Sequence, residues 1–283
     1  MSYNVYTGLL KMFPLPEEKN ENDVFSYQSS SPMFAELKKQ YPIESVAGSG
    51  GDMTKALNLL GWVSGNIYHK GDFNNAIERN SIALLDYAFG KGSEYGINCV
   101  CLSVVLTECL LSIGLKARTV FIMPCSPYDG DNHCVAQVYI PELSKWVMLD
   151  PTYNAVIKNS TGQYLSLLEL RWHLANQEPV FFNDGAKYND ENWTEESTKS
   201  NIEYFAKNLF YFQSNKVSSF GEETYKSAAI TLAPKGYDPK EAQIANIGYR
   251  IRLYGDNQWM QEWLESEKNN QLTYCSALDF EKN

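Results

Sequence analysis

The feature that most constrains the fold of this chain is an apolar run, GINCVCLSVVLTECLLSIGLKAR, from Gly96 to Arg118. It predicts a helix from about Cys99 to Ile113, because Gly114 supplies a C-terminal stop and basic residues follow it. The helix is apolar on nearly all sides, whereas a surface helix has one polar face. The rest of the chain must therefore enclose this helix, and we expect it in the middle of a domain.

The three cysteines of this run could be metal ligands, redox partners or packing residues. Alternatively, one of them could be a nucleophile and the other two could have no catalytic role. On a helix, Cys99 and Cys101 point about 200° apart, so they cannot share one ion. The chain lacks the paired C-x₂₋₄-C spacing of a structural zinc site and the C-x-x-C spacing of a thioredoxin-type redox pair. We therefore expect no metal and no cofactor, and we assign packing roles to Cys101 and Cys109.

Cys99 differs from the other cysteines because it stands at the start of the predicted helix, where unpaired N–H groups and the helix dipole favour a thiolate. A thiolate nucleophile needs a base for its proton and a third group that orients the base. The chain has three histidines. We expect packing or surface roles for His69, at the end of an amphipathic helix, and for His173, within a Leu-rich one. His133 remains as the candidate base.

Three segments after the helix are rich in Val, Ile and aromatic residues and predict an antiparallel meander: 117–124, 133–140 and 145–153. Further helices are predicted over 53–69, 80–89, 165–177, 196–210 and 241–268, with a strand at 225–234. A polar, Ser-rich stretch over 20–50 ends in a loop at 47–52. The chain shows no internal repeat and no low-complexity linker, so we expect one α+β domain over residues 1–283.

The meander brings a carboxylate to His133. If Ile140 pairs with Leu143 across a tight turn, His133 faces Asp150 on the next strand. Directly opposed residues on antiparallel strands project to the same side with Cβ atoms about 5 Å apart, which suits an imidazole–carboxylate hydrogen bond. We therefore expect Asp150 to orient His133, with a turn residue before Pro151 as its alternative role.

The order of these features resembles the transglutaminase-like superfamily, relatives of papain-type cysteine proteases. The resemblance covers roughly 53–153 and rests on Cys99 at a helix start, GLKAR after that helix, His133 at a strand start and WVMLDPTY at the end of the next strand. It implies a central nucleophile-bearing helix packed on an antiparallel sheet, plus additional helices. It also implies that Cys99 is the nucleophile, His133 the general base and acid, and Asp150 the orienting carboxylate.

The resemblance implies an oxyanion hole made by the Cys99 backbone N–H and one upstream donor, for which Trp62 is a candidate. The accessory β-sandwich domains and calcium-site sequences of animal transglutaminases are not visible. The regions 1–45 and 160–283 match no family and are expected to pack on the core as extensions.

From these residues we expect a cysteine-dependent acyl-transfer enzyme, in which Cys99 attacks an amide carbonyl and water or an amine resolves the thioester. No accessory domains are present to build a second substrate tunnel, so hydrolysis of a peptide or protein amide is favoured over glutamine–amine transfer. The alternative from another class is a binding or scaffold module that retains the fold without turnover.

Composition argues against nucleic-acid or membrane partners and against secretion. A formal net charge of −10 opposes binding to phosphate backbones and anionic membranes. No run approaches the roughly 18 apolar residues of a membrane span, and the first twenty residues lack a basic start. Six cysteines are too sparse for a disulfide scaffold. We therefore expect a soluble cytoplasmic protein with free thiols.

Overall fold

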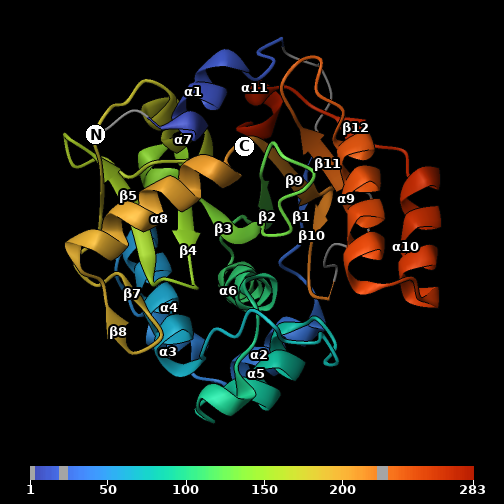
Figure 1. Ribbon diagram of the computed structural model, residues 1–283. Coiled ribbons are helices and arrows are strands. Elements are labelled where there is room, and N and C mark those ends of the chain that lie inside the picture. Colours follow the sequence, from blue (N-terminus) through green and yellow to red (C-terminus); the bar gives the residue numbers. More distant parts are fainter. Residues whose placement is uncertain (1–3, 19–24, 222–228) are drawn as a thin grey trace.

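The computed structural model describes residues 4–18, 25–221 and 229–283 and confirms the α+β class (Figure 1). Its helices are α1 (Val5–Met12), α2 (Pro32–Gln40), α3 (Ile43–Ala47), α4 (Asp52–Asn66), α5 (Ser81–Ala88), α6 (Cys99–Ser112), α7 (Leu167–Ala175), α8 (Glu195–Asn208), α9 (Pro239–Tyr254), α10 (Gln258–Asn269) and α11 (Ala277–Phe280), with 3₁₀ turns η1 (Ser93–Tyr95) and η2 (Pro141–Leu143).

The strands are β1 (Ser26–Tyr27), β2 (Ala117–Met123), β3 (His133–Ile140), β4 (Lys145–Asp150), β5 (Ala155–Asn159), β6 (Val180–Phe182), β7 (Lys187–Tyr188), β8 (Glu191–Asn192), β9 (Tyr211–Asn215), β10 (Val217–Ser218), β11 (Ala229–Leu232) and β12 (Thr273–Tyr274). Eight of them form one sheet in the order β12-β11-β9-β2-β3-β4-β5-β6. The predicted meander β2-β3-β4 is confirmed and lies inside this sheet. The sheet is mixed rather than purely antiparallel, because β11 and β12 run parallel.

The sheet separates two layers of helices. One apolar cluster fills the space between the sheet and α2, α4, α5 and α6, and a second lies on the opposite face with residues of α1, α7 and α8. Residues of β3 alternate between them: Ala136 and Val138 belong to the first cluster and Val135 to the second. His133 has the parity of Val135, so it starts on the face opposite α6.

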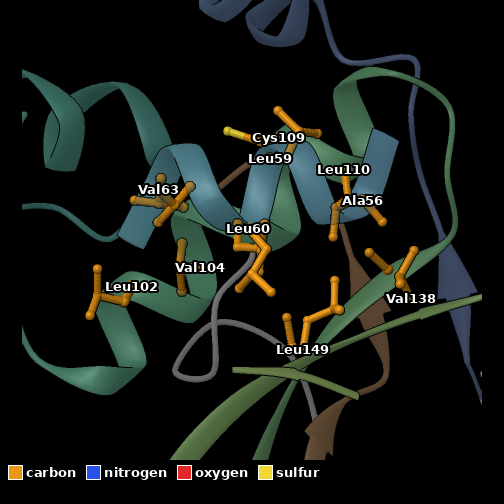
Figure 2. Packing of buried hydrophobic residues seen from close by; sticks show 14 of the residues in the cluster. Ala56, Leu59, Leu60, Val63, Leu102, Val104, Cys109, Leu110, Val138 and Leu149 are labelled. Carbon is orange, nitrogen blue, oxygen red and sulfur yellow. The ribbon is translucent and has the colours of Figure 1, made fainter. Parts of the chain in front are cut away.

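Helix α6 is enclosed as its composition requires. Every residue from Cys101 to Ser112 is buried. Figure 1 shows the helix end-on beneath the sheet, with α2 and α5 below it. Figure 2 shows the interlocking side chains of α4 (Ala56, Leu59, Leu60, Val63), α6 (Leu102, Val104, Cys109, Leu110) and the strands (Val138, Leu149). Cys101 and Cys109 pack in this core, as predicted. Ser103 Oγ also donates to the Cys134 carbonyl at 3.0 Å, which ties α6 to β3 beside His133.

The predicted register between β3 and β4 is wrong by two residues. Ile140 pairs with Lys145 and not with Leu143. The cause is the turn: residues 141–143 form η2, and Ser144 adopts a left-handed conformation with φ of 52°. Because side chains alternate with a period of two, this shift leaves Asp150 on the same face as His133 but diagonal to it.

Several predicted elements differ at their ends. α2 and α3 occupy the stretch expected to be a polar loop, because Ser31 caps α2 and Phe34 and Leu37 are buried. The helix predicted over 241–268 is broken at Gly255, where φ is +86°. Helix α4 ends at Asn66, and His69 lies beyond it in a short bridge to Ile97. Part of the strand predicted at 225–234 falls outside the described residues.

A buried cation holds the C-terminal segment against the meander. The Arg118 guanidinium on β2 lies 4.2 Å from the Phe280 ring centroid and 4.4 Å from that of Trp146. Its Nη2 donates to the Phe280 carbonyl at 2.6 Å and to Gln137 Oε1 at 2.9 Å. Because a guanidinium can stack on rings and donate in its plane at once, one side chain joins β2, β3, β4 and α11.

We expect Arg118→Met to lower the free energy of unfolding by about 3 kcal/mol or more, because hydrogen bonds to a charged group contribute about 1.5–3 kcal/mol each. Urea denaturation measures this change. The matched control, Arg252→Met on the exposed side of α9, should change the free energy of unfolding by less than about 0.5 kcal/mol. Equal effects of the two substitutions would contradict the role given to Arg118.

Candidate active site

The candidate nucleophile, Cys99, lies at the N-terminal end of the buried helix α6, next to the N-cap residue Asn98. Cys99 is the first residue of α6 and is partly exposed, and the Asn98 side chain before it accepts the Cys101 N–H at 3.1 Å. Asn98 Nδ2 in turn donates to Asn75 Oδ1 at 2.9 Å. This cap satisfies one of the helix's unpaired N–H groups and fixes where the helix begins. The Cys99 thiol therefore lies at the positive end of the helix dipole.

The structure brings Cys99, His133 and Asp150 together. His133 Nε2 lies 2.7 Å from Asp150 Oδ2, and the His133 imidazole is near enough to the Cys99 thiol to lower its pKa. Because Nε2 faces the carboxylate, Nδ1 is the ring nitrogen left for the thiol proton. Asp150 Oδ1 accepts the Thr152 N–H at 2.9 Å. Asp150 is thus a turn residue and a partner of His133 at once, so the two roles considered for it do not compete.

The electrostatics favour charge separation between Cys99 and His133. Burial alone would raise the pKa of Cys99, but hydrogen bonding and electrostatic attraction to His133 and His69 lower it to about 6. Burial alone would lower the pKa of His133, but the Asp150 carboxylate and the Cys99 sulfur raise it to about 10. An opposite charge nearby favours the ionised form of each group. Near neutral pH the pair is therefore a thiolate and an imidazolium.

Aromatic rings cover His133 on the side away from α6. The His133 ring centroid lies 5.6 Å from that of Tyr153 and 5.5 Å from that of Tyr204 on α8. The Tyr204 hydroxyl donates to the Asn132 carbonyl at 3.2 Å, which holds the residue before His133. Burial, together with nearby carboxylates, raises the pKa of both tyrosines. Both hydroxyls stay neutral around the imidazole, which is only 2% exposed.

A second histidine, His69, for which the sequence favoured a packing or surface role, lies near Cys99. Helix α4 ends at Asn66, so His69 is not on it; the Ile97 N–H donates to the Tyr68 carbonyl at 3.0 Å and the Lys70 N–H to the Ile97 carbonyl at 2.9 Å. This bridge places His69 beside Ile97, two residues before Cys99, where its imidazole helps to lower the pKa of the thiol. The sequence signal is weak: the β-branched and aromatic pair before His69 favours extended backbone over a helix end.

Two other residues considered from the sequence, Trp62 and His173, pack against aromatic rings. Trp62, considered as an oxyanion-hole donor, packs with its ring centroid 4.9 Å from that of Phe89 and 6.3 Å from that of Tyr41. It belongs to the helical layer beneath the sheet. His173 lies on α7 with its ring 5.1 Å from that of Trp172.

Within residues 4–18, 25–221 and 229–283, three features are absent. No group of three or more His, Cys, Asp or Glu side chains is arranged to hold a metal ion. No disulfide joins cysteines within these ranges. No helix in them combines the length and apolarity needed to cross a bilayer.

We expect iodoacetamide at about pH 6.5 to label Cys99 much faster than the other five cysteines, because only a thiolate is nucleophilic. Cys125 is the internal control: it is also partly exposed, but burial raises the pKa of its thiol. The rate at Cys99 should fall as the pH drops through about 6, where the thiolate takes up its proton. Peptide mapping by mass spectrometry measures both rates, and earlier labelling of Cys101 or Cys125 would contradict the assignment.

Comparison with known proteins places this geometry in a family. Residues 39–151 match the model of the transglutaminase-like superfamily. The comparisons with curated proteins and with solved structures found no match. The matched segment runs from the end of α2 to the residue after Asp150, so it contains Cys99, His133 and Asp150 but not the extension that carries α8. The resemblance seen in the sequence is confirmed for residues 39–151, which match the transglutaminase-like superfamily.

Proposed function

We propose that the protein is a cysteine-dependent acyl-transfer enzyme that hydrolyses a peptide-like amide bond through a thioester on Cys99. The observation that carries the proposal is the contact of the Cys99 thiol with an imidazole whose Nε2 lies 2.7 Å from the buried Asp150 carboxylate. A nucleophile, a base and an orienting group in hydrogen-bond contact are the elements of triad catalysis. The family match supports the same class of chemistry.

In the acylation step, the Cys99 thiolate attacks the amide carbonyl carbon, and the C=O electron pair moves onto the oxygen. The tetrahedral intermediate then collapses: the C=O bond re-forms and the C–N bond breaks. The His133 imidazolium gives its proton to the leaving nitrogen, so an amine departs and His133 becomes neutral. Asp150 holds the ring throughout and stabilises its charged form before the transfer.

In the deacylation step, water attacks the thioester while neutral His133 takes its proton. Collapse of this second intermediate releases a carboxylic acid and returns Cys99 as a thiolate beside the His133 imidazolium. Water is the acceptor in this proposal because it needs no binding site of its own, whereas an amine acceptor must be held against the thioester. The substrate is a peptide or protein amide.

We expect Asp150→Asn to lower Cys99-dependent turnover of a peptide substrate about 10³- to 10⁴-fold, because the imidazole loses the carboxylate that orients it and stabilises its cation. His133→Ala should be at least as severe. The matched control is Asp256→Asn in the exposed loop between α9 and α10, which should leave turnover unchanged. Circular dichroism checks folding, and near-normal turnover in folded Asp150→Asn would limit Asp150 to its turn role.

The choice between water and amine is tested with a library of glutamine-containing peptides, incubated with and without a primary amine and analysed by mass spectrometry. We expect cleaved or deamidated products to outnumber amine adducts, and we expect both to disappear in Cys99→Ala. A majority of amine adducts would replace hydrolysis by glutamine–amine transfer. The absence of any Cys99-dependent product would favour a binding or scaffold module.

A further inference from the structure

The unexplained feature of the site is the second imidazole, and a hairpin outside the matched segment holds it. Strands β7 and β8 pair over Lys187–Asn192, with the turn residues Asn189 and Asp190 between them. Asn189 Oδ1 accepts the His69 N–H at 2.8 Å, and Asn189 Nδ2 donates to the His69 carbonyl at 3.3 Å. The Tyr68 hydroxyl donates to the Asp190 carboxylate. The hairpin therefore fixes the backbone of His69 on both sides of its Cα.

The hairpin also fixes the ring. The Tyr188 hydroxyl lies 3.0 Å from His69 Nδ1, and the two ring centroids are 5.6 Å apart. Where the Tyr188 hydroxyl donates to Nδ1, the proton of a neutral imidazole lies on Nε2. Since Nδ1 faces Tyr188, Nε2 is the nitrogen left to face Cys99. In this tautomer His69 can present a donor toward the sulfur.

We propose that His69 Nε2–H is the second donor of the oxyanion hole, with Tyr188 and Asn189 as its positioning residues. The inference rests on the proposed function and names a residue for it. The first donor is the Cys99 N–H: it belongs to the first turn of α6, whose N–H groups have no partner within the helix. The Asn98 cap serves the Cys101 N–H, so the N–H of Cys99 is left for the substrate.

The chemistry of the first step explains how one donor can serve sulfur and then oxygen. When Cys99 attacks, negative charge leaves the sulfur and develops on the carbonyl oxygen, which is bonded to the same carbon. A donor already directed at the sulfur lies within a short displacement of that oxygen. Donors fixed before the reaction stabilise developing charge without reorganising, and the loss of one costs about 10²- to 10³-fold in rate.

The two imidazoles have partners that suit different tasks. His133 faces the Asp150 carboxylate, which stabilises a cation and suits a group that carries a proton. His69 faces a neutral phenol, which fixes a tautomer without adding charge. His133 is therefore the group suited to move the proton, and His69 is suited to donate a hydrogen bond.

The test uses p-nitrophenyl acetate, which acylates a reactive thiolate through an oxyanion and needs no specific recognition. The C–S bond forms, the ester C–O bond breaks, and p-nitrophenolate leaves and is measured by absorbance. We expect His69→Leu to slow acylation of Cys99 about 100-fold, and His69→Gln, whose carboxamide can donate, to recover the rate to within about tenfold of the unsubstituted protein. Iodoacetamide alkylation forms no oxyanion, so its rate at Cys99 should change far less in both variants.

A second arm tests the positioning residues. Tyr188→Phe keeps the ring and removes the hydroxyl, so acylation should slow about tenfold while alkylation of Cys99 stays constant. Tyr254→Phe, on an exposed tyrosine of α9, is the matched control and should change neither rate. If His69→Leu does not fold, the His69→Gln and Tyr188→Phe comparisons decide the question.

The outcomes separate the two proposals. If the unsubstituted protein is alkylated at Cys99 but not acylated there, the proposed function fails. If it is acylated and His69→Leu is acylated equally fast, the role of His69 as a donor is overturned while the function stands. Acylation and alkylation that fall by the same factor in His69→Leu would make His69 a partner of the thiolate only, and would also overturn the inference.

Discussion

The arrangement of this protein depends on the burial of α6. A helix that is apolar on every side must be covered on every side, so the sheet lies against one flank and α2, α4 and α5 against the others. Each fully buried Leu or Val side chain contributes about 1.5–3 kcal/mol to stability, and a shift of the helix along its axis would disturb many of them. The position of Cys99, at the N-terminal end of the helix, is therefore set by the core.

The parts of the site that local pattern can define were predicted from the sequence. Residue periodicity gave α6 and the meander, and the position of Cys99 at a helix start followed from them. The predicted register, which aligned His133 with Asp150, was wrong. The alternation of apolar and polar residues along the strands does not indicate the conformation of the 141–144 turn. The proximity of the two side chains survived this error, since a diagonal neighbour is still within reach of an imidazole.

The sequence could not predict contacts between residues that lie far apart in the chain. His69 lies near the thiol for two reasons. Helix α4 ends three residues earlier than its periodicity suggests, and the β7–β8 hairpin, about 120 residues away, hydrogen-bonds the His69 backbone. No sequence pattern around His69 indicates its contact with this hairpin. Trp62 was a candidate donor by position alone, and its ring packs against Phe89 and Tyr41 in the helical layer. The C-terminal extension thus contributes to the site although it lies outside the family match.

The turn at η2 connects β3 to β4, and its length can vary only in certain ways. His133 and Asp150 share a face that is opposite to the one α6 occupies, and β4 continues from Ser144 without a break. A shift of one residue in the β3–β4 pairing would turn Asp150 to the α6 side, whereas a shift of two would keep it on the His133 side. A change in the length of this connection is therefore compatible with the site only where the turn itself, or a bulge in β3 or β4, absorbs it.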